Sequence, residues 1–299
     1  MALDARRLVV LQAIAEQRSF TRAAEALVMT QPAVSRQLAA LEAEVGTQLV
    51  ERGPRHVALT PAGAALVEEA ESILPAIDAA ARRLKGFAAS DGGAVRLGAV
   101  PSAMASFVPT ALHALRRARP RVEIQVQEGW SADLARLTAR GDLDLAVVST
   151  SGTAPLPTGA TLLREPLVVL LAADHPLARR RRLALDDLAE EPWLVATEPG
   201  GRQAITTAYA DAGFTPRIVG SVAWHAAERL IAIGLALALA PQSTGARLAR
   251  DPDVVAKPLN NAPVRELRLI TPARPRRTPV ERELEAHLHD AATHVLSAA

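Results

Sequence analysis

The sequence of 299 residues contains no cysteine, and this absence removes several kinds of chemistry. It excludes a disulfide framework, thiolate metal ligands, a thiol nucleophile and redox sensing by cysteine. Aromatic residues are also scarce, at 3% of the chain, whereas hydrophobic residues make up 49%. We therefore expect cores built from Leu, Val, Ala and Ile, in a chain long enough for two or three domains of about 100–150 residues each.

Long apolar runs are lacking as well. The longest run, residues 230–240, is too short to span the hydrocarbon core of a bilayer, which is about 30 Å thick. Charged residues interrupt the first 20 positions, so no apolar core of a signal peptide is found there. We therefore expect a soluble cytoplasmic protein with no membrane partner.

The chain has little surplus charge of either sign, although its pI is about 9.6. The formal net charge is +2, and residues 1–90 hold ten basic and ten acidic side chains. Bulk charge therefore gives no argument for nucleic acid binding. Any such argument must rest on the positions of individual arginines.

The first 46 residues contain three helical patterns, at about residues 4–17, 21–27 and 30–46. Thr30 suits the N-cap of the third helix, Pro32 suits its first turn, and Gly46 suits its end. Three helices with a three-residue break before the last are typical of a helix-turn-helix. Spacing alone also allows a plain helical bundle with a solvated polar face.

The third helix has two distinct faces. Its apolar residues recur at helical spacing and form one buried stripe, made of Val34, Leu38, Leu41 and Val45. The other face carries polar side chains of the kind that reach base edges and phosphates in a major groove. The residues expected to read the major groove are Gln31, Pro32, Ser35 and Arg36. Thr21 and Thr30 are expected near phosphates at the starts of the second and third helices.

A basic hairpin is predicted directly after these helices. Two short apolar runs, residues 49–50 and 57–59, flank the segment "ERGPRH". This pattern places Arg52, Arg55 and His56 near the tip of a two-stranded hairpin. Such a hairpin forms a wing suited to the narrow minor groove or to flanking phosphates, and we expect DNA contacts from Arg52 and Arg55.

The same stretch resembles the N-terminal domain of LysR-type transcriptional regulators. The motifs that carry the resemblance are "SFTRAAE", "TQPAVSRQL", "LE", "LVER" and "LTPAG". They cover about 60 residues densely, and a looser resemblance extends over the whole chain. Val50 stands where the family usually has Phe, which is a core substitution away from the reading face. The resemblance implies a ligand-responsive transcription regulator that binds double-stranded promoter DNA.

A long helix is expected to follow, since Thr60 suits its N-cap and Pro61 its first turn, and the helical pattern continues to about Lys85. Pro75 should bend it. Its apolar residues step by four and three, which is a heptad seam that favours a partner helix. The seam residues expected to dimerise are Leu66, Ile73, Ile77 and Leu84. In LysR-type regulators the equivalent helix dimerises, but packing on the chain's own second domain is the alternative.

The resemblance also implies an assembly, a homotetramer of the chain that bends promoter DNA. RNA polymerase is a further candidate partner. The sequence leaves open whether the chain is a dimer or a tetramer in solution, and whether it activates or represses.

The last two hundred residues alternate between strands and helices. Strands are expected at 94–100, 122–129 and 143–150, with helices at 107–117 and 132–140 between them. A second set of strands and helices follows from residue 166, and the chain ends in a strand at 264–273 and a helix at 279–296. This βαβ alternation predicts a parallel sheet. Two α/β lobes resemble the periplasmic-binding-protein-like effector domain of the LysR family.

These patterns define an α/β protein with an N-terminal winged helix-turn-helix, a long linker helix and a two-lobed effector domain. The expected boundaries are a DNA-binding domain at 1–60, a linker helix and hinge at 61–91, and an effector domain at 92–299. Within the effector domain, the first lobe comprises 92–163 and 265–299, and the second lobe comprises 164–264.

Effector contacts are expected where strand ends and helix N-termini converge, because unpaired N–H groups face a ligand there. The strand ends supply Pro101, Ser102, Met104, Ser149, Thr150 and Thr197. The resemblance adds Trp130, together with Trp224 and His225 at a helix start. For each of these residues the alternative is ordinary helix capping or core packing. The effector itself is a small molecule of unknown identity.

Catalytic motifs are missing from the sequence. There are seven histidines but no HExxH, no tight histidine cluster and no phosphate-binding glycine loop. Asp142 and Asp144 fit a turn between a helix and a strand, and the arginines at 179–182 fit a solvated loop. We therefore expect no catalytic residues, no metal and no cofactor. The rival interpretations are a solute-binding protein and an α/β enzyme without a role on DNA.

Overall fold

The computed structural model of the chain describes residues 3–52, 57–88, 93–149, 159–197, 202, 206–210, 213–273 and 277–295. Contacts along the backbone divide the chain into two compact units. The first comprises Met1–Leu84 with Arg140–Asp142, and the second comprises Lys85–Ala139 with Leu143–Ala299. Among the described helices, none has both the length and the apolar character that crossing a membrane requires.

The first unit begins with three helices, α1 (Ala5–Gln17), α2 (Phe20–Ala26) and α3 (Gln31–Val45). Side chains cap the first two, because Asp4 Oδ1 accepts from the Arg6 N–H at 2.9 Å and Ser19 Oγ accepts from the Arg22 N–H at 3.4 Å. Gly46 ends α3 with a φ of 73°, a left-handed conformation that glycine adopts at little cost. The predicted helix-turn-helix is confirmed.

The core of the first unit is formed by the apolar stripes of these helices. In α3 the residues Val34, Leu38 and Leu41 are fully buried, as the periodicity predicts, while Val45 is only partly buried. Ala23 and Ala24 are buried where α2 meets its neighbours, and their small side chains allow the helices to approach closely. The cluster also includes residues of α1, namely Leu8, Val10, Leu11, Ala13 and Ile14.

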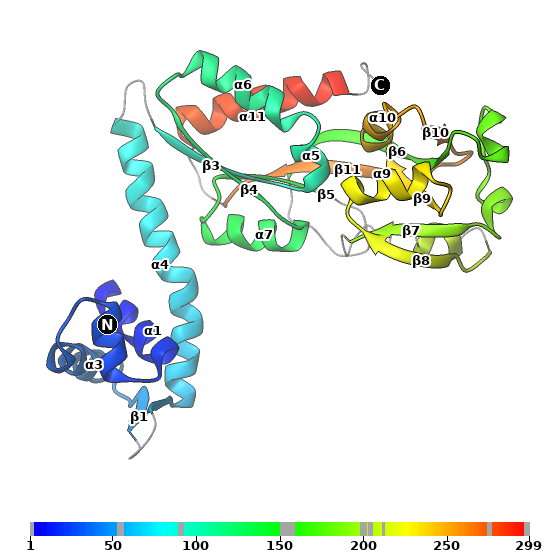
Figure 1. Ribbon diagram of the computed structural model, residues 1–299. Helices are drawn as coiled ribbons and strands as arrows, with labels where there is room; N and C mark the ends of the chain where they lie inside the picture. The colour runs from blue at the N-terminus through cyan, green and yellow to red at the C-terminus, as the bar shows by residue number, and fades with distance from the viewer. Residues whose placement is uncertain are drawn as a thin grey trace. The chain divides into compact units, whose positions relative to one another are not determined.

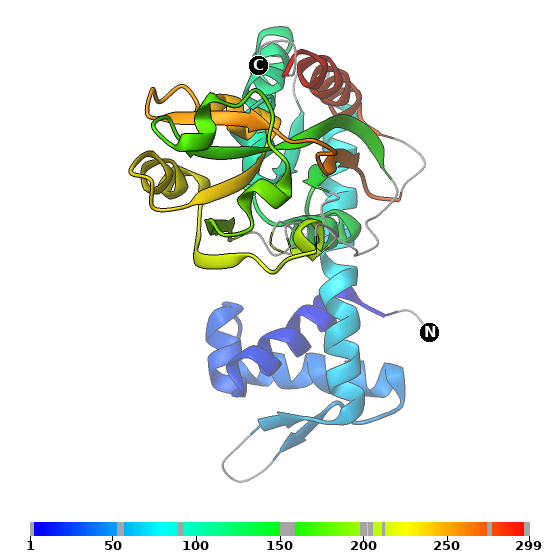
Figure 2. The ribbon, with the colours of Figure 1, turned by 90° about the vertical axis from the view of Figure 1, so that its right-hand side faces the viewer.

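A two-stranded hairpin follows, made of β1 (Val50–Arg52) and β2 (Val57–Leu59). The strands are antiparallel, with Val50 opposite Leu59. Glu42 of α3 fixes the base of the hairpin, since its Oε1 accepts from the N–H groups of Leu49 at 2.9 Å and of Val50 at 3.3 Å. Figure 2 shows the two strands at the end of this unit where α4 begins.

Helix α4 (Pro61–Ala88) has 28 residues and contains Pro75 in its interior. The Thr60 hydroxyl accepts from the Gly63 N–H at 3.0 Å, which is the expected N-cap. The heptad predicts a seam that packs against a partner helix, but the first half of the seam packs within the head itself. Ala70 is fully buried in the core of the first unit, and Leu66 and Ile73 pack against the same core.

The second half of the seam differs. Ile77 is 47% exposed and Leu84 is 71% exposed. The dimerisation residues predicted from the heptad therefore fall into two groups, one already covered by the head and one open.

The second unit is built on a mixed sheet, whose described strands are ordered β4-β3-β5-β11-β6-β9-β7-β8, with β10 paired to β6. In chain order they are β3 (Ala94–Ala99), β4 (Glu123–Glu128), β5 (Leu145–Ser149), β6 (Ala160–Ala172), β7 (Pro192–Ala196), β8 (Arg217–Val222), β9 (Leu237–Pro241), β10 (Val254–Pro258) and β11 (Val264–Ile270).

Strand directions only partly match the predicted parallel sheet. The three strands β3, β4 and β5 are parallel in one lobe, and β7, β8 and β9 are parallel in the other. However, β6 and β11 pair antiparallel to each other, β11 pairs antiparallel to β5, and β6 pairs antiparallel to β9. These two strands carry the chain from the first lobe to the second and back, so they run in opposite directions.

The helices of the second unit are α5 (Pro101–Met104), α6 (Val108–Ala118), α7 (Ser131–Arg140), α9 (Trp224–Ala232), α10 (Gln242–Leu248) and α11 (Pro279–Val295), with short 3₁₀ turns η1 (Pro176–Arg179) and η2 (Leu185–Leu188). Figure 1 shows α6 and α11 side by side over one face of the first lobe and α7 over the other. Between them, β5 is buried along its whole length, which explains its continuous apolar run, whereas the edge strand β4 is mostly exposed.

Candidate functional site

The exposed end of α3 presents the side chains expected to read DNA. Gln31, Pro32 and Arg36 are all exposed there, on the side away from the buried stripe. Thr30 occupies the N-cap position and is exposed, but its side chain makes no capping hydrogen bond. Polar side chains and a guanidinium at the start of such a helix are able to contact base edges and phosphates.

Ser35 departs from the expectation that it faces outward. Its side chain is partly buried, and its Oγ atom is inaccessible to solvent with no hydrogen-bond partner among the described residues. It precedes Leu38 by three positions, so it lies at the border of the apolar stripe. In this conformation the Ser35 hydroxyl cannot reach a base edge.

The other predicted DNA contacts are placed differently. Thr21 is exposed in the first turn of α2, whereas the N-cap of that helix is Ser19. The backbone of Arg52 ends β1, and its side chain is outside the described part of the chain. Arg55 also lies outside the described residues.

The predicted effector contacts of the first lobe converge at one edge of the sheet. The Val100 N–H donates to the Val147 carbonyl at 3.1 Å, which joins the end of β3 to β5. The Gly129 N–H donates to the Ala99 carbonyl at 3.3 Å, which joins the segment before Trp130 to β3. These bonds bring three predicted contacts to the same set of strand ends, namely Pro101, Trp130 and Ser149.

Ser149 is tied to this edge by a further bond, since its N–H donates to Ser131 Oγ at the start of α7 at 3.0 Å. Met104 is only partly exposed and packs against the apolar core of the first lobe, so the alternative of core packing is supported for it. Thr150 lies outside the described residues.

The second lobe gathers the remaining predicted contacts. Ala196 at the end of β7 pairs with Val222 at the end of β8. Thr197 follows the first strand and is exposed, while Trp224 and His225 open α9 one residue after the second. His225 is exposed and Trp224 is partly buried. The parallel strands therefore bring these three side chains to one end of the lobe.

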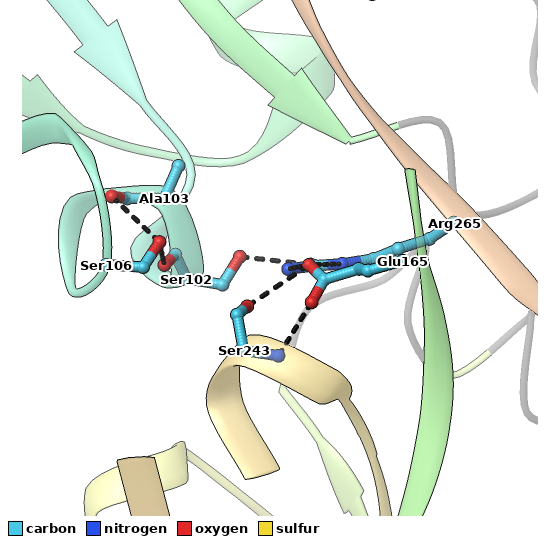
Figure 3. A network of polar contacts seen from close by, with 6 residues as sticks. All are labelled: Ser102, Ala103, Ser106, Glu165, Ser243 and Arg265. Carbon is cyan, nitrogen blue, oxygen red and sulfur yellow. Dashed lines mark hydrogen bonds and ion pairs between the residues drawn. The ribbon is translucent and has the colours of Figure 1, made fainter. Parts of the chain in front are cut away.

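A buried polar network surrounds Ser102 (Figure 3). Glu165 on β6 and Arg265 on β11 are direct cross-strand partners, and they are 0% and 5% exposed. Glu165 Oε1 accepts from Arg265 Nη2 at 2.6 Å and from Nε at 3.0 Å. Arg265 Nη1 donates to Ser102 Oγ at 3.0 Å.

The same carboxylate also reaches α10. Glu165 Oε2 accepts from the Ser243 N–H at 2.7 Å, and Oε1 accepts from the Ser243 hydroxyl at 3.2 Å. The network therefore links a residue of the first lobe, two crossing strands and a helix of the second lobe. A buried ion pair of this kind is stable because hydrogen bonds satisfy both charged groups.

Sequence reasoning missed Glu165, Arg265 and Ser243. One signal for Arg265 was present, because it alternates with Leu267 and Leu269 in β11 and so belongs to the buried face of that strand. A charge at an inward position requires a partner. The partner itself was not predictable, since it lies 100 residues away in the sequence.

An open groove of about 1340 Å³ lies in the same unit, and Ser106 and Ser243 are among its lining residues. Of the predicted effector contacts that the structure describes, none lines it. Ser106 donates to the Ser102 carbonyl at 2.7 Å. The polar network therefore extends from the strand ends to this groove.

Other candidate residues have structural partners. Asp144 accepts from the Arg96 N–H at 2.9 Å and from Arg96 Nη2 at 3.1 Å, which supports its assignment to a turn. In the loop at 179–182, Arg180 pairs with Asp187 at 2.9 Å. The Ala184 N–H and Arg180 hold the pKa of Asp187 below its ordinary value. No cluster of three metal-binding side chains occurs among the described residues.

Comparison with known families matches both units. The model "Bacterial regulatory helix-turn-helix protein, lysR family" matches residues 5–64, and the model "LysR substrate binding domain" matches residues 88–293. The two models are those of a regulatory helix-turn-helix protein and of a substrate-binding domain of the same family. The chain belongs to the LysR family.

Similar individual proteins agree with this assignment. The chain is 37% identical to a probable hydrogen peroxide-inducible genes activator of Mycobacterium avium, over 62% of this chain and 60% of that protein. It is 30% identical to the uncharacterized regulator YcgK of Bacillus subtilis, over 85% of this chain and 84% of that protein. The alignments with the first two curated relatives span 60% and 63% of their lengths.

A solved structure of a mutant OxyR from Corynebacterium glutamicum is similar along the whole chain. Its TM-score is 0.63 at 26% sequence identity, and the match covers 100% of this chain and 94% of that one. The match therefore extends over both units of the chain.

Proposed function

We propose that the chain is a transcription regulator that reads promoter DNA with α3 and responds to a small molecule bound by the second unit. The observation that carries this proposal is the exposed set Gln31, Pro32 and Arg36 at the start of a helix whose opposite face is fully buried. The match of both units to LysR-family models supports it. The wing is assigned to flanking phosphates through Arg52 and Arg55.

The effector is assigned to the strand ends of the two lobes. Ser102, Trp130 and Ser149 supply one side, and Thr197 with the start of α9 supplies the other. A bound molecule changes the lobes only if its affinity differs between two conformations of the domain. We infer that the chain acts by binding and not by catalysis.

The mode of sensing must differ from thiol oxidation. A relative of the chain is named for induction by hydrogen peroxide. This chain has no cysteine, so it cannot form a sulfenic acid or a disulfide. We therefore propose a noncovalent effector.

The assembly is proposed as a dimer through the open half of the α4 seam, with a tetramer as the complete form. Two heads then read a pseudo-palindromic operator. Action on promoter DNA places the protein in the cytoplasm, where RNA polymerase is a candidate partner.

DNA titration tests the reading face. Genomic fragments selected by the purified chain provide a duplex, and binding is followed by fluorescence anisotropy at several salt concentrations. Arg36→Ala should lose about 1–3 kcal/mol of specific binding and keep its helix content. The matched control is Arg117→Ala, which removes the same charge from an exposed position on α6 of the second unit. This variant should bind the DNA with the affinity of the wild type. Equal affinity for the wild type and Arg36→Ala would show that another face reads the DNA.

A further inference from the structure

The hydroxyl of Ser102 has a fixed orientation in the network of Figure 3. A guanidinium carries only donors, so Arg265 Nη1 must donate to Ser102 Oγ at their separation of 3.0 Å. The hydroxyl oxygen is therefore an acceptor toward Arg265. Its own proton must point to another group.

No described residue accepts that proton, although Ser102 is only 7% exposed. Two other hydroxyls of the first lobe, buried Thr138 and partly buried Ser106, behave differently. Thr138 Oγ1 donates to the Leu134 carbonyl at 2.7 Å, and Ser106 Oγ donates to the Ser102 carbonyl at 2.7 Å. Buried polar groups are nearly always paired, so an available donor at a strand end indicates a place for a ligand acceptor.

Glu165 decides what kind of group meets this donor. It takes two hydrogen bonds from Arg265 and therefore balances the positive charge inside the protein. The ligand consequently meets the Ser102 hydroxyl and not a bare cation. A guanidinium behind the hydroxyl oxygen polarises the O–H bond, which favours an anionic acceptor over a neutral one.

We propose that Arg265, held in place by Glu165, is a positioning residue that turns the Ser102 hydroxyl into a fixed donor and thereby selects an effector with a carboxylate oxygen at this point. This inference rests on the proposed function, in which Ser102 belongs to the effector site. It adds two residues that do not touch the effector but determine which chemical group is accepted.

The test compares small acids with their amides on the full chain. Three matched pairs serve as probes: succinate and succinamide, benzoate and benzamide, and acetate and acetamide. Binding is measured by the rise in melting temperature across a concentration series. At least one acid should bind about tenfold or more tightly than its amide, the ratio expected for a hydrogen bond to a charged group. Equal binding within all three pairs, or no binding by any acid, would overturn the proposal.

Variants of Ser102 assign the preference to its hydroxyl. Ser102→Ala should abolish the preference for the acid, and Ser102→Thr, which keeps a hydroxyl, should restore part of it. An unchanged preference in Ser102→Ala would overturn the proposal.

Charge removal tests the positioning pair. The double variant Arg265→Met with Glu165→Gln removes both buried charges together, which avoids leaving one unpaired. It should bind acid and amide with affinities within about twofold of each other, because the hydroxyl is then free to rotate. The matched control is Arg268→Gln with Glu266→Gln, a more accessible pair on the same strand at 2.9 Å, and it should keep the preference. A preference that persists in the first variant overturns the role of Arg265.

A second variant covers the case in which the double substitution does not fold. Arg265→Lys keeps the charge but has no planar fork, so it should weaken the preference without removing the ion pair. An undiminished preference in Arg265→Lys, when the double variant is unfolded, counts against the positioning role. DNA binding by the same preparations is measured separately. If the wild-type chain does not bind DNA, the proposed function is contradicted. If it binds DNA but does not prefer the acids over their amides, only this inference is contradicted.

Discussion

Gly63 of α4 lies directly against the carbonyl oxygen of Leu49, so closely that a Cβ atom at position 63 would be 2.0 Å from that oxygen. The oxygen cannot move away freely, because it accepts a hydrogen bond from the Thr60 N–H at 3.0 Å. The contact joins the start of the long helix to the base of the wing. Only glycine allows it.

Gly63→Ala should therefore destabilise the head. Alanine is ordinarily about 1 kcal/mol better than glycine inside a helix, but here the clash with the backbone reverses the sign. We expect a loss of about 1–3 kcal/mol in the free energy of unfolding, measured by thermal unfolding of the full chain. Ala64→Ser, at an exposed position of the same turn, should have little effect. An alanine variant at least as stable as the wild type would contradict this account.

Val28 should be replaceable with a gain in stability. It lies in the turn of the helix-turn-helix with a φ of 55° and is 95% exposed, so it gains little from packing. A β-branched side chain in the left-handed region is strained. Val28→Asn should raise the free energy of unfolding by roughly 1 kcal/mol, since asparagine tolerates this conformation. Chemical denaturation of the full chain measures the change.

Val126→Asn is the matched control for this gain. Val126 is also exposed, at 53%, but it lies in extended strand β4, where valine is favoured. This variant should be no more stable than the wild type. Stabilisation by both substitutions would point to a general surface effect and not to strain at Val28.

The two halves of the α4 seam should separate assembly from folding. Ile77→Asp with Leu84→Asp changes exposed residues, so the melting of the head should be unchanged while the dimer dissociates. Leu66→Asp with Ile73→Asp places charges against the core of the head, so it should destabilise the fold itself. Sedimentation equilibrium at micromolar concentration, combined with thermal unfolding, distinguishes the two effects. A monomeric wild-type chain would contradict dimerisation through this helix.

Local features of the head were predictable from the sequence because they depend on neighbours along the chain. The stripe of Val34, Leu38 and Leu41 follows from helical periodicity alone, and its burial is confirmed. Ser35 was misplaced because it borders that stripe, where spacing does not decide whether a hydroxyl turns in or out. The seam of α4 has the same periodicity whether it packs on its own head or on a second chain. Spacing therefore could not show which seam residues are buried in the head and which remain exposed.

In the second unit, contacts between distant segments limited what the sequence could predict. Its strands and their ends were predictable, and so was the gathering of Pro101, Trp130 and Ser149, because parallel strands end at one edge. The antiparallel pairing of β6 and β11 was not predictable, since it depends on pairing between distant segments. The same holds for the bond from Arg265 to Ser102, which spans 163 positions of the sequence.

Tyr209 should make the stability of the second unit sensitive to alkaline pH. It is fully buried beside Trp193 at a ring separation of 4.8 Å, and its hydroxyl has no partner among the described residues. Burial raises the pKa of its phenol well above the ordinary value of about 10. Above that pH the unfolded chain releases the proton while the folded chain retains it. The stabilisation is therefore complete below about pH 10 and is lost as the pH rises.

By about pH 11 this one group should lower the free energy of unfolding by roughly 1.4 kcal/mol. Tyr209→Phe removes the ionisable hydroxyl and nothing else, so the difference in stability between the variant and the wild type should grow by that amount between neutral and alkaline pH. Denaturation by urea at both pH values measures it. The chain contains a single tyrosine, so the ultraviolet absorbance of tyrosinate reports this residue alone. A folded wild-type chain that shows tyrosinate absorbance near pH 10 would mean that the hydroxyl is accessible to water, and the alkaline loss would then have another source.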